Sequence, residues 1–228
     1  MNSAVIPTLV EDYYGDDKWM CMHKRFLMEA EEREPEVVLI GDFTIAMLAH
    51  TEVWEKYFVS MHCLNFGISE DKTQNVLWRI ENGEIETMNP KIIVLSVGAN
   101  NYENTAQEVV EGVRACVTAI RSYHNSAEIV VLKLFPCGQY PNPVREKINQ
   151  INSLLEAELK ASPNIQVVNL DPGFVQTDGT INHHDLYDYK HLTRRAYMQA
   201  FSPLSDLIQQ LIRELTLPQA ETPTLPDE

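Results

Sequence analysis

Basic residues are scarce in this 228-residue sequence. It has 18 lysines and arginines against 33 aspartates and glutamates, which gives a formal net charge of −15. Nucleic acids and anionic membranes are poor partners for such a chain, because both are bound through basic surfaces. The acidic residues are spread along the chain, so we expect a solvated acidic surface or, as the alternative, a protein partner with a basic face.

Cysteines and long apolar runs are also scarce. The four cysteines show no C-x-x-C spacing, and Cys63 and Cys116 lie in apolar stretches, so we expect reduced thiols with these two buried. The first thirty residues carry acidic side chains where a secretory signal is basic and then apolar, which predicts a cytoplasmic protein. No run approaches the roughly 18 apolar residues of a transmembrane helix, so we expect a soluble chain without membrane insertion.

A linker rich in proline, glycine and serine is absent from the interior of the chain. We therefore expect a single domain over residues 36–215. Residues 1–35 are predicted to form an N-terminal arm that packs on this domain and contains a short helix at 18–32. Residues 216–228 are polar and rich in proline, and we expect them to form a disordered tail.

Five short apolar runs rich in β-branched residues alternate with longer segments of helical period. Continuous apolar runs are typical of strands that are covered on both faces. The predicted strands are 37–40, 63–66, 92–97, 129–134 and 167–170, and the predicted helices are 44–58, 72–83, 104–123, 143–160 and 193–215. The alternation predicts an α/β fold, a three-layer αβα sandwich around a five-stranded parallel sheet.

The sequence contains an acid and a base for acyl transfer but lacks the nucleophile. Asp188 and His191 form a D-x-x-H motif before the last predicted helix, a spacing that lets the carboxylate orient the imidazole. The turn after the first predicted strand is a place where a nucleophile could stand, but it presents Phe43, which has no lone pair to attack with. Asn100 follows the third strand, where its amide either stabilises an oxyanion or stabilises the turn.

Four sequence blocks carry a family resemblance. G-D-F-T, N-F-G-I, G-A-N-N and D-x-x-H, in this order and spacing, resemble the blocks of the SGNH (GDSL-type) hydrolases. The longer segments E-P-E-V-V-L-I-G-D, V-L-W-R-I-E-N-G-E and H-D-L-Y-D-Y-K-H-L-T resemble, within that family, the catalytic alpha subunits of the intracellular brain-type (1B) platelet-activating factor acetylhydrolases. The resemblance extends from about residue 16 to 215.

The resemblance implies a flavodoxin-like SGNH hydrolase fold and assigns roles to five positions. Phe43 stands at the position of the serine nucleophile, and Glu70 at that of an oxyanion-hole glycine. Asn100 matches the other oxyanion donor, and Asp188 and His191 match the orienting acid and the base. A carboxylate about 4 Å from an oxyanion would cost up to about 4 kcal/mol. We therefore predict a pseudoenzyme that uses no cofactor and no metal.

The resemblance also implies partners. Alpha subunits of this family form dimers that bind a WD-repeat regulatory protein associated with lissencephaly. A homologue that has lost its nucleophile and kept its fold suits such a binding role. We therefore expect a homodimer that acts as a scaffold or binding partner of that regulatory protein.

Other interpretations remain open at this stage. Thr44 could act as a displaced nucleophile, but Ser and Thr beside a helix start are more often caps. The histidines and aspartates of the cluster His183, His184, Asp185, Asp188 and His191 could ligate a metal, although no H-x-x-x-H spacing is present. The chain could be an active esterase that removes the sn-2 acetyl group of platelet-activating factor-like phospholipids. It would then use a nucleophile that we have not identified, or Phe43 would be an engineered substitution in an active enzyme. It could also be a sensor whose old pocket holds a small apolar ligand.

Overall fold

The computed structural model describes residues 1–216, and it confirms the predicted five-stranded parallel sheet. The strands are β1 (Val37–Gly41), β2 (Cys63–Gly67), β3 (Ile92–Ser96), β4 (Glu128–Leu132) and β5 (Ile165–Val168), in the order β2-β1-β3-β4-β5. This is the doubly wound order in which the chain switches direction between β1 and β3. The carboxyl ends of those two strands therefore form the crevice where a ligand is expected. The predicted tail lies outside the described residues, except for Thr216.

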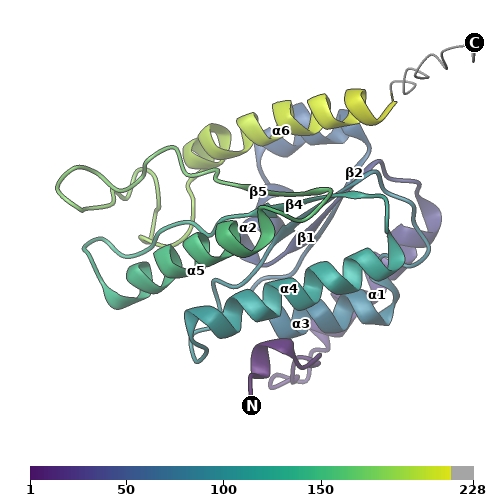
Figure 1. Ribbon diagram of the computed structural model, residues 1–228, viewed down its shortest axis with the longest axis horizontal. Coiled ribbons are helices and arrows are strands. Elements are labelled where there is room, and N and C mark those ends of the chain that lie inside the picture. The colour runs from purple at the N-terminus through teal and green to yellow at the C-terminus, as the bar shows by residue number, and fades with distance from the viewer. Residues whose placement is uncertain (217–228) are drawn as a thin grey trace, which may run out of the picture.

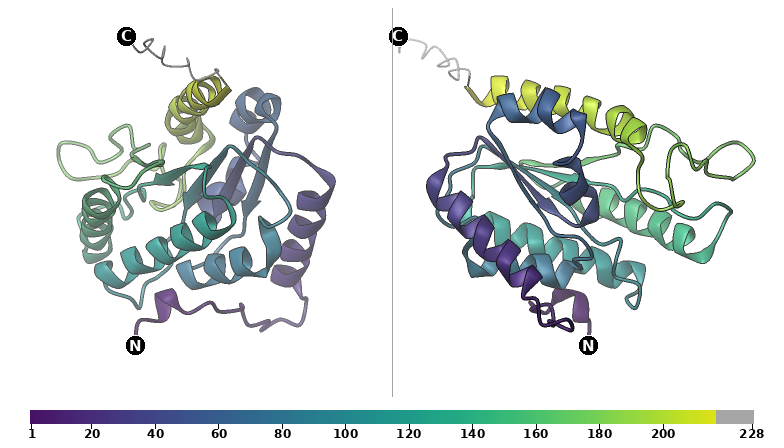
Figure 2. Two further views of the ribbon diagram at one scale, coloured as in Figure 1. Left: turned by 45° about the vertical axis from the view of Figure 1, so that its right-hand side comes forward. Right: turned by 180° about the vertical axis from the view of Figure 1, so that it is seen from behind.

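Helices cover both faces of the sheet (Figures 1 and 2). The α-helices are α1 (Lys18–Glu32), α2 (Phe43–Leu48), α3 (Thr73–Arg79), α4 (Ala106–Tyr123), α5 (Pro143–Leu159) and α6 (Arg194–Thr216). Helices α1, α3, α4 and α5 pack on one face, and α2, α6 and the π-helical segment Trp54–Phe58 pack on the other. The result is the predicted three-layer sandwich. Within residues 1–216 no helix is both long and apolar enough to cross a membrane.

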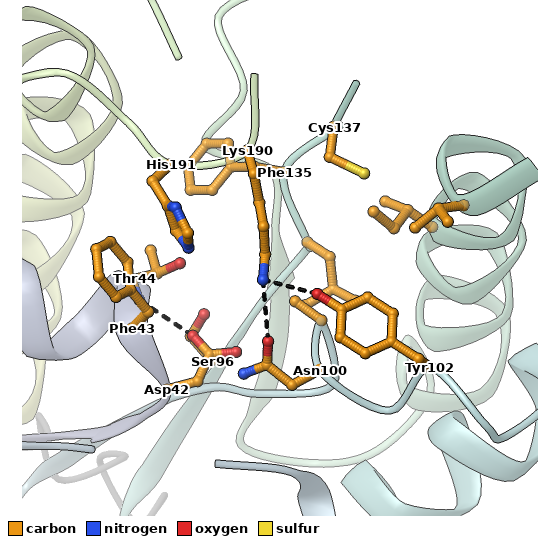
Figure 3. A pocket seen from close by; sticks show the side chains of 14 residues that line it. Asp42, Phe43, Thr44, Ser96, Asn100, Tyr102, Phe135, Cys137, Lys190 and His191 are labelled. Atoms are coloured by element: carbon orange, nitrogen blue, oxygen red, sulfur yellow. Dashed lines mark hydrogen bonds between the residues drawn. The ribbon is translucent and has the colours of Figure 1, made fainter. Parts of the chain in front are cut away.

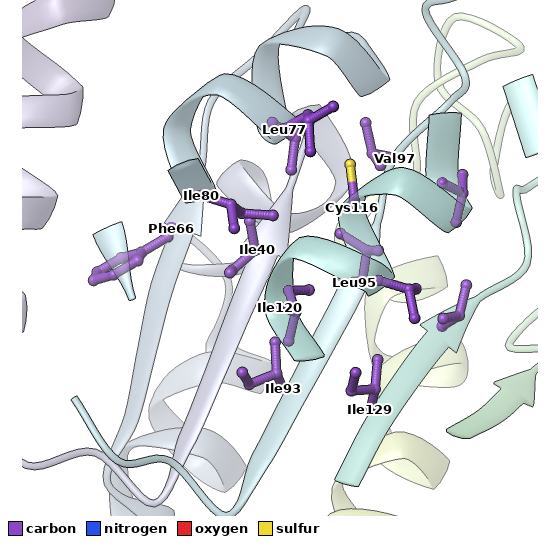
Figure 4. Close-up of a cluster of buried hydrophobic side chains, with 14 of the residues drawn as sticks. Ile40, Phe66, Leu77, Ile80, Ile93, Leu95, Val97, Cys116, Ile120 and Ile129 are labelled. Carbon is purple, nitrogen blue, oxygen red and sulfur yellow. The ribbon is translucent and has the colours of Figure 1, made fainter. Parts of the chain in front are cut away.

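The core consists of two apolar clusters separated by the sheet. Successive strand residues point to opposite faces, so Ile40 and Leu95 belong to the cluster under α3 and α4, whereas Leu39 and Val94 belong to the cluster under α6. Figure 4 shows the first of these clusters between β1, β3 and the helices above them. Both faces of each central strand are buried, which explains why these strands read as continuous apolar runs.

The structure corrects two predicted helices. The single helix expected at 44–58 is wrong, because α2 ends at Leu48 and the π-helical segment begins only at Trp54. The hydroxyl of Thr51 donates a hydrogen bond of 2.7 Å to the Leu48 carbonyl and closes the intervening turn. The helix expected at 72–83 is α-helical only to Arg79 and continues as a π-helical turn, Ile80–Glu84, which contains a glycine with positive φ.

A fully buried guanidinium lies beneath the carboxyl ends of β1 and β2. The Arg79 side chain donates to Asp71 (2.9 Å) and to Glu84 (2.5 Å), and it also reaches the carbonyls of Phe66 (3.1 Å) and Gly41 (3.3 Å). These contacts tie together the two strand ends and the loop that follows β2. Arg79 therefore holds in place the ends of β1 and β2 and the loop after β2, which lie beside the candidate site.

The N-terminal helix completes this buried network. The Trp19 indole donates to Asp71 (2.7 Å), and the His23 ring bonds Glu84 (2.9 Å). Burial raises the pKa of Asp71 to about 6, although the charge of Arg79 and the bond from Trp19 act against that rise. Both carboxylates that hold Arg79 are thus also held by α1.

Candidate active site

Phe43 stands at the first position of α2, directly after β1. Asp42 is the N-cap of this helix, because its side chain accepts the Thr44 amide at 3.1 Å, so the capping role expected for Thr44 belongs to Asp42. The Phe43 ring lies 4.0 Å from the His191 ring, centroid to centroid. The structure therefore places Phe43, which we expect at the position of a serine nucleophile, against His191, which we expect to match the base.

Asp188 and His191 form the expected pair. Asp188 Oδ2 lies 2.7 Å from His191 Nδ1, while Asp188 Oδ1 accepts the backbone amides of Lys190 (3.1 Å) and His191 (2.7 Å). Burial acts to raise the pKa of Asp188, but the hydrogen bonds from the His191 amide and ring outweigh it and hold the pKa below the usual aspartate value. Asp188 thus stays ionised and orients the imidazole, which lines the site cavity.

Asn100 lies at the carboxyl end of the sheet, in the loop after β3. It is buried, and its Nδ2 donates to the Asp71 carbonyl at 3.1 Å, so it stabilises the loop that follows β2. The amide also lines the site cavity, where its Oδ1 accepts a hydrogen bond from Lys190 at 3.3 Å. An amide nitrogen has two donors, so the bond to Asp71 leaves one for the cavity.

Glu70 departs from the arrangement expected of it. Its side chain is exposed and is not among the residues that line the cavity. Its backbone has φ of 68°, in the left-handed region that glycine adopts without strain. Glu70 therefore places no carboxylate in the cavity, and its backbone has the conformation that suits the glycine we expect at this position.

The cavity has a volume of about 50 Å³ and opens between the loops at the carboxyl ends of the strands (Figure 3). Of the predicted site residues, Phe43, Asn100 and His191 line it. Lys190 and Tyr102 also line it, and we did not predict them. Lys190 lies inside D-Y-K-H, and Tyr102 directly follows the G-A-N-N block, so their closeness to the motifs was the available signal.

Asp42 is the third cavity residue that we did not predict from the sequence. It is 2% exposed, and in the described part of the chain its Oδ2 has no hydrogen-bond partner. Burial raises the pKa of Asp42 to about 7; Asp71 adds to that rise, whereas the Thr44 amide and Lys190 oppose it. Its carboxyl group therefore changes charge near neutral pH at the wall of the cavity.

The predicted metal alternative has no geometric support. The His183 and His184 rings lie 4.1 Å apart, centroid to centroid, and are tilted by 39° against each other, whereas the Asp188 carboxylate bonds His191. In residues 1–216 no three His, Cys, Asp or Glu side chains gather as metal ligands.

Comparison with known proteins identifies the family. The sequence model of the GDSL-like Lipase/Acylhydrolase family matches residues 47–199. The chain is 46% identical over 213 residues to the platelet-activating factor acetylhydrolase IB subunit alpha1 of Homo sapiens, covering 93% of this chain and 92% of that protein. It is 47% identical over 214 residues to the platelet-activating factor acetylhydrolase IB subunit beta homolog of Drosophila melanogaster, covering 94% and 95%.

Solved structures of low sequence identity share the fold. A GDSL-like lipase from Bacteroides thetaiotaomicron superposes with a TM-score of 0.67 at 18% identity, over 85% of this chain and 98% of that one. The carbohydrate acetylesterase Est24 from Sinorhizobium meliloti gives a TM-score of 0.60 at 14% identity, over 78% and 100%. Fold, motif order and sequence identity agree, and the chain belongs to the GDSL-like lipase/acylhydrolase family, in the group of the platelet-activating factor acetylhydrolase IB subunits.

Proposed function

We propose that this protein is a catalytically inactive member of its family, a pseudoenzyme of the serine-esterase class. The observation that carries the proposal is the Phe43 ring, which lies 4.0 Å from the His191 ring at the position where the family places a serine. A hydrocarbon ring can neither attack a carbonyl carbon nor give its proton to the imidazole. Removal of the nucleophile from a well-studied serine protease lowers the rate about 10⁶-fold.

Two observations favour an alternative, an active acetylhydrolase that removes the sn-2 acetyl group of platelet-activating factor-like phospholipids. The Asp188–His191 pair keeps a hydrogen bond of 2.7 Å, and relatives carry the name acetylhydrolase. Thr44 is the hydroxyl residue nearest in sequence to the lost serine, and it lines the same cavity. In the described part of the chain, however, no hydrogen bond joins its hydroxyl to His191, so we do not assign it the role of nucleophile.

The purified protein can be tested with a short-chain nitrophenyl ester and a fluorophosphonate probe. We expect hydrolysis at the rate of buffer and no covalent labelling. Stoichiometric labelling, or ester hydrolysis that disappears in His191→Ala, would refute the inactivity. A Thr44→Val variant then shows whether Thr44 is the nucleophile, because valine keeps the shape and removes the hydroxyl.

We also propose that the chain forms a homodimer in the cytoplasm and acts as a scaffold or binding partner of the WD-repeat lissencephaly-associated protein. A groove of about 700 Å³ follows the edge strand β2 and is lined by both signs of charge, including Arg25, Arg33, Glu29 and Glu34. A surface that meets its own copy across a two-fold axis needs such self-complementarity. The cysteines are free thiols, two of them buried, which is compatible with a reducing compartment.

Ultracentrifugation tests the dimer, with an expected mass of about 52 kDa, twice that of the 26.1-kDa chain. A monomer at micromolar concentration would contradict it. Pull-down of the WD-repeat protein at low salt tests the partner, and we expect equal capture by the wild type and by His191→Ala, because binding through the acidic surface needs no chemistry. Failure of both to capture it would remove the scaffold role.

A further inference from the structure

Two adjacent tyrosines lie outside the packed structure, in the loop before α1. Tyr13 is 80% exposed and Tyr14 is 92% exposed, whereas Tyr140, the next most exposed tyrosine in residues 1–216, is 63% exposed. Figure 2 shows this loop outside the helices that cover the sheet. A large aromatic side chain gains free energy when it is buried, so the packing of this chain does not explain why two neighbouring rings are left in water.

The tyrosine loop, residues 11–17, makes local hydrogen bonds in the described structure. All of its residues are exposed, and the Asp12 carboxylate accepts the backbone amides of Gly15 (3.0 Å) and Asp17 (3.1 Å). Before the loop, the Thr8 amide donates the last backbone hydrogen bond to another element, α3. The loop can therefore open into an extended segment without breaking a contact of the core. An enzyme needs this freedom in order to take a side chain into its own cleft.

Carboxylates flank the two tyrosines on both sides. Glu11 and Asp12 precede them and Asp16 and Asp17 follow them, so the tyrosine loop carries a formal charge of −4. Solvation of a loop requires polar side chains but no aromatic rings. An exposed phenol with acidic neighbours suits an enzyme whose substrate groove is basic, because charge patterns help kinases to distinguish their substrates.

We propose that Tyr13 and Tyr14 are phosphorylated by a protein tyrosine kinase that has a basic substrate groove and uses ATP. A bond forms between the phenol oxygen and the γ-phosphorus, and the bond from that phosphorus to the bridging oxygen of ADP breaks. ADP leaves, and the phenol proton passes to the catalytic base of the kinase. The inference goes beyond the scaffold role and does not depend on it, because this chain is only the substrate.

The phosphate stays available to a partner. It adds a charge of about −1.5 to −2 and three acceptor oxygens at pH 7. In residues 1–216 the ion pair of the tyrosine loop joins Asp17 to Lys24 at 3.7 Å, and no arginine pairs with a carboxylate of the loop. Arginine is the side chain that binds phosphate through two parallel hydrogen bonds. The modified loop therefore presents a phosphotyrosine to an arginine-containing pocket of another protein.

Phosphorylation of the purified full chain tests the proposal directly. The protein is incubated with magnesium, ATP and the catalytic domain of a tyrosine kinase that prefers acidic flanking residues, and the phosphate is located by mass spectrometry. We expect it on Tyr13 or Tyr14 at a rate at least about tenfold higher than on Tyr140. Tyr140 is the internal control, because it is exposed but has no acidic residue within five positions.

Paired variants separate the role of charge from that of exposure. Glu11→Gln with Asp16→Asn should slow the reaction about tenfold at low salt, because it halves the charge that steers the loop into the kinase. Glu52→Gln with Glu55→Gln removes two charges from exposed residues elsewhere and should leave the rate unchanged. Circular dichroism confirms that both variants are folded.

Expression in animal cells treated with a tyrosine-phosphatase inhibitor provides the second readout. The wild type should carry phosphotyrosine, and Tyr13→Phe with Tyr14→Phe should remove most of it. Three results would each overturn the proposal: the absence of phosphate on both tyrosines in cells, a phosphotyrosine signal that the double variant retains, or an unchanged rate when Glu11 and Asp16 are neutralised.

Discussion

The Phe43 ring lies 4.0 Å from the His191 ring and is tilted against it by 45°. On its other side His191 still bonds Asp188 at 2.7 Å, so the base remains oriented although it faces a hydrocarbon. An aromatic contact of this kind contributes about 0.5 to 1.5 kcal/mol beyond its buried area. The pair has therefore kept a packing role that does not depend on catalysis.

Because the orientation of His191 survives, the site should be recoverable. Phe43→Ser together with Glu70→Gly is expected to restore measurable hydrolysis of a nitrophenyl acetyl ester. Phe43→Ser alone should restore less, because the turn at Glu70 then keeps a strained φ of 68°, although the Glu70 side chain itself does not line the cavity. The restored activity should disappear when His191→Ala is added. A folded double variant that stays inert would mean that the loops around Asn100 have moved from catalytic geometry.

Glu70 should be a site of backbone strain. Its φ of 68° is costly for a residue with a Cβ, so Glu70→Gly is expected to raise the free energy of unfolding by about 1 kcal/mol. The neighbouring Ser69 is also exposed but is not among the residues of positive φ, and Ser69→Gly should be neutral or destabilising. Urea unfolding of both variants measures the difference, and an equal effect of the two would rule out local strain as the cause.

Asp42 should make stability depend on pH. The folded protein holds the Asp42 proton up to about pH 7, while the unfolded chain releases it near the usual value of 3.8, so the free energy of unfolding falls as pH rises between these values. Asp42→Asn keeps the cap oxygen and removes this titration. The variant should therefore be more stable than the wild type at pH 8, by about 2 kcal/mol or more, and the gain should vanish near pH 4. A gain independent of pH would contradict the assigned pKa.

Arg79 should be the most sensitive charged position. Arg79→Met leaves Asp71 and Glu84 buried without their shared cation, and we expect a loss of about 3 to 5 kcal/mol in the free energy of unfolding. Arg114→Met is the matched control, since Arg114 pairs with Glu158 at 3.0 Å on the surface and should cost less than about 1 kcal/mol. Similar losses in the two variants would show that the buried network does not hold the strand ends.

The sequence allowed the sheet to be predicted well because its strands are buried on both faces. Every residue of β1 and β3 is buried, so each reads as an apolar run with no competing interpretation. The helices were harder, since the apolar period continues past Leu48 although the chain turns there through hydrogen bonds of Thr51 and His50. The spacing of apolar residues shows which face of a helix is buried, but it does not show where the backbone hydrogen-bond pattern changes.

The site was predictable only where a motif fixes the chain. Asp188 and His191 are three residues apart and form the expected hydrogen bond. The Phe43 ring contacts the His191 ring because the turn after β1 is short. Lys190 and Tyr102 are 88 residues apart, and their bond depends on how two loops cross above the sheet. Spacing along the chain carries no information about such a pair.

The contacts of Trp19 and His23 bear on how the protein can be shortened. A chain that began at residue 36 would retain the whole sheet and every motif of the family, yet Asp71 and Glu84 would each lose a hydrogen-bond partner contributed by α1. Asp71 is also the residue whose carbonyl holds Asn100. Trimming the N-terminus would thus disturb the candidate site from a distance, and preparations for binding or rescue assays should include residues 1–35.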